Sequence, residues 1–113
     1  MSCCSEDGAG AAHAVAAPTG ADPAETRQAP QKFQEFLKTA NAPGALDAGT
    51  KQAIAIALSV LAKCEPCLKT HLQKARDMGF SQEAIDEAAW MAIAFGGSPT
   101  MMFYKTAAAQ KAK

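Results

Sequence analysis

The chain has 113 residues and carries 11 basic and 11 acidic side chains, so its formal net charge is zero. This balance excludes the blanket positive charge with which many nucleic-acid-binding domains attract phosphates, and we expect no nucleic-acid partner. No segment approaches the ~18 consecutive apolar residues of a membrane-spanning helix, so we expect no membrane partner and a soluble protein.

Residues 1–31 are rich in Ala, Gly and Pro and hold no periodic apolar pattern. Such a segment buries too little apolar surface to offset the entropy of ordering, so we predict a disordered tail over 1–31 and a helical domain over 32–113. The mildly apolar stretch 11–17 lacks the preceding basic residues of a secretory signal. Intracellular proteins use C-x-x-C pairs for redox or metal chemistry, and we expect a cytoplasmic location.

Two helices are expected in the first half of the domain. The first extends over Pro30–Ala40, and three apolar residues recur at helical spacing along it: Phe33, Phe36 and Leu37. The second begins after Asp47, a favourable N-cap residue, and reaches about Lys63. Its apolar residues alternate with Ala and Ser, and in a run of this length without Pro that pattern favours a helix buried on most sides.

The second half predicts further helices with clear boundaries. One begins in the Cys64 motif and ends at Met78, with Gly79 as a left-handed cap, and Ser81 caps the next. Residues 88–95 are apolar all round, so in a chain this short we expect a neighbouring subunit to cover part of them.

The chain then breaks at Gly96-Gly97 and restarts as a helix at Ser98-Pro99, with the last helical turns reaching Ala109. No segment shows the pattern of a β-strand. The sequence therefore predicts an all-α fold, a compact bundle of about five helices that forms oligomers.

The reactive chemistry is concentrated in Cys64-Glu65-Pro66-Cys67, followed by His71. Pro66 suits the first turn of a helix, which places both thiols at a helix N-terminus, where unpaired N–H groups favour the thiolate. His71 lies one turn beyond Cys67, so both sulfurs and the imidazole are expected on one face. This arrangement predicts a dithiol with a nearby proton carrier.

Two other interpretations of these residues stay open. The cysteines could be small buried hydrophobic residues, or Cys64, Cys67 and His71 could be three ligands of a zinc ion in a non-enzymatic metal-binding module. A closed zinc site needs a fourth ligand, which only a second subunit or the tail residues could supply: Cys3, Cys4 and His13.

The order of these residues resembles the carboxymuconolactone decarboxylase superfamily, and within it the alkylhydroperoxidase D-like branch. The likeness covers about residues 32–106. The family motif is Glu, eleven residues, Cys, two residues, Cys, three residues, His. Cys64, Cys67 and His71 match it residue by residue, whereas its Glu position falls on Gln52.

The resemblance implies a helical homotrimer or homohexamer that reduces small hydroperoxides, with a dithiol or thioredoxin-like protein as electron donor and no cofactor. It implies that Cys67 reacts with peroxide and that Cys64 then closes the disulfide. Helix electrostatics alone would favour Cys64, which is nearer the helix start and expected to be less buried. We follow the resemblance for the order of attack.

Gln52 departs from the motif in a way that matters for catalysis. An amide cannot take up a proton, so the relay would be reduced to His71, water and Glu65 as a possible substitute acid, and we expect slow or absent peroxidase turnover. A lactone decarboxylase-type activity is a further alternative, because that branch shares the fold without needing a C-x-x-C pair.

Overall fold

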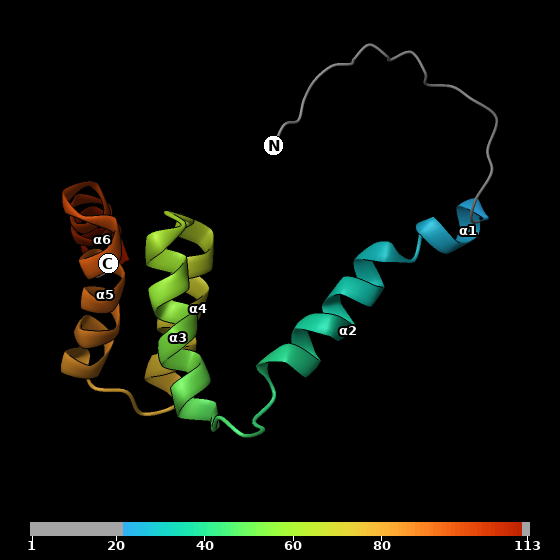
Figure 1. The fold of residues 1–113 in the computed structure, drawn as a ribbon, viewed down its shortest axis with the longest axis horizontal. Coiled ribbons are helices and arrows are strands. Elements are labelled where there is room, and N and C mark those ends of the chain that lie inside the picture. Colours follow the sequence, from blue (N-terminus) through green and yellow to red (C-terminus); the bar gives the residue numbers. More distant parts are fainter. Residues whose placement is uncertain (1–21, 112–113) are drawn as a thin grey trace, which may run out of the picture. The chain divides into compact units, whose positions relative to one another are not determined.

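The computed structural model describes residues 22–111. All regular elements in this part are helices, and the predicted all-α fold is confirmed: α1 (Pro23–Thr26), α2 (Ala29–Asn41), α3 (Ala48–Leu61), α4 (Glu65–Asp77), α5 (Gln82–Gly96) and α6 (Ser98–Lys111) (Figure 1). Over these residues, no helix is both long enough and apolar enough to cross a membrane. The chain divides into two compact units, and the boundary between them falls in the sequence between Lys38 and Thr39.

Helical structure begins earlier in the chain than the sequence predicted. Asp22 caps α1 by accepting a hydrogen bond from the Ala24 N–H at 3.0 Å, and Pro23 occupies the first turn, where its missing N–H is no loss. Residues 23–26, which we assigned to the disordered tail, are therefore helical, and α2 begins at Ala29, one residue before the predicted start at Pro30. Residues 1–21 of that tail lie outside the described part. Along α2, the Phe33 and Phe36 rings stack with centroids 6.3 Å apart.

The second unit contains the helical bundle that positions the cysteines. Helix α3 packs against α4 and α5, and α5 packs against α6, so α3 lies at the centre of the contacts (Figure 1). Large aliphatic side chains from three helices fill the core, and alanines on α5 and α6 allow close approach: Ile56, Val60, Leu68, Leu72, Ile85, Ala89 and Ala107. The core is small, which agrees with the alanine-rich composition.

The helix boundaries agree with local capping chemistry. The Asp47 carboxylate accepts a hydrogen bond from the Thr50 N–H at 2.7 Å at the start of α3, and Ser81 Oγ accepts one from the Ala84 N–H at 3.1 Å at the start of α5. Gly79 has φ +94° directly after α4, as a left-handed cap requires. These predicted ends are confirmed.

Burial in the single chain differs from the prediction on α3, and α5 exposes part of the apolar segment for which we expected cover from a neighbouring subunit. We expected α3 to be buried on most sides, but Ile54 and Leu58 are exposed along one side of it. In α5, Trp90 and Met91 are also exposed, and Phe95 is 81% exposed. The physical reason is that one small subunit has too few helices to surround either of these two.

Candidate active site

The corner between α3 and α4 places the first cysteine. Helix α3 ends at Leu61, and the next residues form a Schellman motif, in which the Lys63 N–H donates to the Val60 carbonyl and the Cys64 N–H donates to the Ser59 carbonyl, each at 3.1 Å. Lys63 adopts the left-handed conformation of this motif, with φ 56°, although it is not glycine. Cys64 is thereby fixed to the end of α3.

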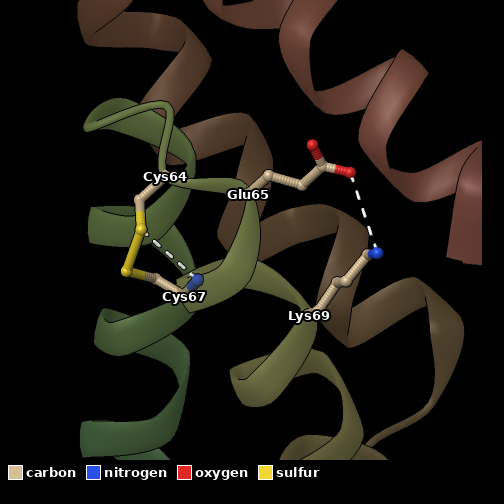
Figure 2. A network of polar contacts seen from close by, with 4 residues as sticks. All are labelled: Cys64, Glu65, Cys67 and Lys69. Atoms are coloured by element: carbon tan, nitrogen blue, oxygen red, sulfur yellow. Dashed lines mark hydrogen bonds and ion pairs between the residues drawn. A yellow bond between two sulfur atoms is a disulfide. The ribbon is translucent and has the colours of Figure 1, made fainter.

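Cys64 is also the N-cap of α4, as predicted. Its sulfur accepts a hydrogen bond from the Cys67 N–H at 3.3 Å, and its carbonyl accepts one from the Leu68 N–H at 2.9 Å. The Cys64 and Cys67 side chains form a disulfide, with their Cα atoms 5.3 Å apart (Figure 2). The two-residue spacing at a helix start thus keeps the two sulfurs within bonding reach.

Exposure of the two cysteines is the reverse of what we expected. Cys67 is exposed, whereas Cys64 is half-buried at the helix corner. The reason is that Cys64 sits where α3 ends and α4 begins, so both helices cover it, while Cys67 projects from the first turn of α4 alone. Access therefore favours attack at Cys67, whereas the N–H donated to Cys64 favours a thiolate there.

The structure brings Gln52 and His71 together across the α3–α4 interface. The buried Gln52 Nε2 donates a hydrogen bond to the His71 carbonyl at 2.8 Å and lies 3.3 Å from Nδ1 of the imidazole. Cys67 and His71 both belong to α4, four residues apart, so they project from the same side of the helix. The structure thus pairs Gln52 with His71 at the α3–α4 interface, and Cys67 lies one turn before His71 on α4.

The surroundings of His71 favour its neutral form. Partial burial lowers the pKa of the imidazole below its ordinary value of 6.5, and the positive charge of Lys74 lowers it further. Near neutral pH the ring is therefore uncharged and can act through one N–H and one lone pair.

Glu65, the possible substitute acid, is directed away from the sulfurs. Its carboxylate lies 3.8 Å from the Lys69 ammonium, an exposed pair one turn apart on α4, and Figure 2 shows both side chains on the side of the helix opposite the disulfide. A proton path from Glu65 to the sulfurs would need another rotamer.

Comparison with known proteins agrees with this geometry. The carboxymuconolactone decarboxylase family matches residues 27–111, which is most of the chain. The chain belongs to the carboxymuconolactone decarboxylase family.

Solved structures of carboxymuconolactone decarboxylase family proteins share the fold. A family protein from Legionella pneumophila is 32% identical, with a TM-score of 0.67 over 74% of this chain and 75% of that one. A Thermotoga maritima family protein, for which a part in the antioxidative response has been suggested, is 28% identical, with a TM-score of 0.68 over 74% of this chain and 86% of that one.

Relatives are also found among curated sequences. An uncharacterized protein of the cox locus of Paracoccus denitrificans is 42% identical over 60 residues, which cover 53% of this chain; the chain spans 54% of that relative's length. An uncharacterized protein of Cupriavidus necator is 34% identical over 77 residues, and the match covers 68% of each chain.

The structure does not assemble the predicted zinc ligands within one chain. Among residues 22–111, no three His, Cys, Asp or Glu side chains lie close enough to hold a metal ion, and the two sulfurs are bonded to each other. Cys64, Cys67 and His71 therefore form no three-ligand cluster in this state. The tail candidates for a fourth ligand lie outside the described residues: Cys3, Cys4 and His13.

Sequence reasoning missed the role of Lys63. Its Nζ donates to Oγ1 of the fully buried Thr100 on α6 at 3.3 Å, which ties the corner beside Cys64 to the last helix. No sequence signal marks this position, because a left-handed helix cap is usually glycine and here it is lysine. The interruption of the apolar pattern between Leu61 and Cys64 is the nearest hint.

Proposed function

We propose that this protein is a thiol–disulfide oxidoreductase of the alkylhydroperoxidase D-like branch, with Cys64 and Cys67 as its redox pair. The observation that carries the proposal is the Cys64–Cys67 disulfide at the start of α4, with Cys67 exposed. A disulfide that one sulfur presents to solvent is open to attack by an external thiolate. The suggested antioxidative part of the Thermotoga maritima relative supports the same chemistry.

The substrates we propose are small hydroperoxides. The Cys67 thiolate attacks the terminal peroxide oxygen, the O–O bond breaks, and the alcohol leaves with a proton from water, so that Cys67 becomes a sulfenic acid. The Cys64 thiol then displaces this oxygen as water and forms the S–S bond. An external dithiol, free or on a thioredoxin-like protein, supplies the two electrons that restore both thiols.

We place this chemistry in an oligomer in the cytoplasm. The cytoplasm keeps dithiol donors reduced, as the cycle requires. The apolar side chains exposed along α3 and α5 support a homotrimer or homohexamer, because contact between subunits would remove them from water: Ile54, Leu58, Met91 and Phe95.

Peroxide consumption with dithiothreitol tests the proposal in full-length protein. The background is a variant with Cys3→Ser and Cys4→Ser, so that only the α4 pair can react. Peroxide should be consumed, Cys67→Ser should abolish consumption, and Cys64→Ser should leave a sulfenic acid on Cys67 that dimedone traps. Absence of both consumption and disulfide closure would refute the function, and dimedone labelling only of Cys64 would reverse the order of attack.

A further inference from the structure

The contact between Gln52 and His71 fixes the orientation of the Gln52 amide. The side chain is 4% exposed, and its Nε2 lies 2.8 Å from the His71 carbonyl oxygen. A carbonyl oxygen only accepts hydrogen bonds, so the atom facing it must be the NH₂ group. An amide turned the other way would oppose two acceptor oxygens inside the α3–α4 interface, which is costly for buried groups.

This orientation determines what Nδ1 of His71 meets. The NH₂ group has a second hydrogen, and Nδ1 lies 3.3 Å from the same nitrogen. An unprotonated Nδ1 can accept that hydrogen. A protonated Nδ1, whether in the other neutral tautomer or in the imidazolium, would set one N–H donor against another in a partly buried place.

We propose that Gln52 is a positioning residue that holds His71 in the neutral tautomer with its proton on Nε2. The tautomer follows from the contact itself, whereas its role in catalysis rests on the proposed function. In this tautomer His71 donates a hydrogen bond through Nε2 and does not take up a proton. In the reduced protein of the proposed cycle, we expect this N–H to donate to a thiolate on Cys67, one turn away on the same helix, while the thiol proton leaves to water.

The same geometry explains what glutamate would do at this position. A carboxyl group that donates its own proton to the His71 carbonyl presents its second oxygen to Nδ1 as an acceptor. The imidazole proton then moves to Nδ1, and Nε2 becomes a free base. The amide and the acid thus select opposite tautomers, and Gln52 converts a proton-accepting histidine into a fixed hydrogen-bond donor.

Nitrogen-15 NMR of histidine-labelled, full-length protein tests the tautomer directly, with His71→Ala to assign the signals. At about pH 7.5 the wild-type ring should be neutral. The tautomer with its proton on Nε2 should outnumber the Nδ1 tautomer by on the order of tenfold or more. Gln52→Met keeps the shape without the donor and should shift the ring toward the tautomer mixture of free histidine. Gln52→Glu should move the proton to Nδ1, whereas Gln73→Glu, an exposed control on α4, should leave the tautomer unchanged.

Activity gives a separate readout. Gln52→Glu should raise kcat/KM for peroxide near neutral pH by about 10²–10⁴-fold, the usual contribution of one positioned general base. If Nε2 carries the proton but no variant reduces peroxide, the proposed function fails and the tautomer assignment stands. If wild-type His71 carries its proton on Nδ1, or Gln52→Glu leaves the tautomer unchanged, the role of Gln52 is refuted whatever the activity.

Discussion

Gly96 is the last residue of α5, next to side chains of α6 and of the end of α3, and a methyl group there has no room. A Cβ at this position would come 2.9 Å from Cβ of Thr100 and 3.0 Å from Cδ1 of Leu61, closer than carbon atoms approach without a shift. Thr100 is fully buried and its N–H donates to the Gly97 carbonyl at 3.0 Å, so it cannot move aside alone. We predict that Gly96→Ala forces α5 and α6 apart.

The expected magnitude follows from two opposing effects. Alanine in place of a helical glycine stabilises by ~0.5–1 kcal/mol, because glycine loses more backbone entropy on folding. Overpacking a well-packed interior costs ~1–3 kcal/mol. Gly49 supplies the matched control, because its added Cβ would meet only Oδ1 of Asp47 at an ordinary 3.6 Å. The free energy of unfolding of Gly96→Ala should therefore fall ~1–3 kcal/mol below that of Gly49→Ala.

Urea unfolding followed by circular dichroism, at one fixed protein concentration, measures this difference. In a domain of this size 1 kcal/mol corresponds to a shift of roughly 4–8 °C in Tm, so thermal melts provide a second measurement. Equal stabilities for Gly49→Ala and Gly96→Ala would refute the close approach of α5 and α6 described for Gly96.

Three further predictions concern charge and assembly. Because the folded state lowers the pKa of His71, stability should rise with pH from that lowered pKa up to about 6.5, and His71→Gln should remove this slope in urea titrations. Tyr104, the single tyrosine, donates to the Asp86 carboxylate at 2.8 Å, and burial together with this bond raises its pKa. Ultraviolet titration should show Tyr104 ionising well above pH 10 in the wild type and at a lower pH in Asp86→Asn. Tyr104→Phe should lower the free energy of unfolding by ~1–2 kcal/mol. Light scattering should give the wild-type protein the molar mass of a trimer or hexamer. Phe95→Glu should have a smaller molar mass with unchanged helix content, and a monomeric wild type would contradict this prediction.

Local chemistry made much of the fold predictable from the sequence. Asp47 and Ser81 bond to N–H groups three residues ahead, and Gly79 needs only its own backbone freedom, so neighbouring residues alone determine these helix ends. The start of α4 at Cys64 and Pro66 follows the same logic. Lys63 could not be predicted in this way, because lysine has no preference for the left-handed conformation that it adopts after α3. Its contact with Thr100 on α6 comes from the tertiary fold.

Features that depend on helix packing were harder to predict. The pairing of Gln52 with His71 requires the relative placement of α3 and α4, and only the family resemblance singled out Gln52 beforehand. Exposure of Cys67 also depends on which helices cover the corner. Phe95 belongs to a segment that the sequence showed to be apolar all round; its exposure in one chain depends on helix packing, and cover by a neighbouring subunit stays a prediction.

The dual attachment of Cys64 separates what the fold needs at this position from what the chemistry needs. Its backbone N–H and carbonyl close the helix corner whatever the side chain, and the side chain must only accept one N–H. Serine, aspartate or asparagine would serve that purpose better than a thiol, since oxygen is the stronger acceptor. Architecture therefore gives no reason for sulfur at residue 64, whereas the proposed thiol–disulfide cycle requires it.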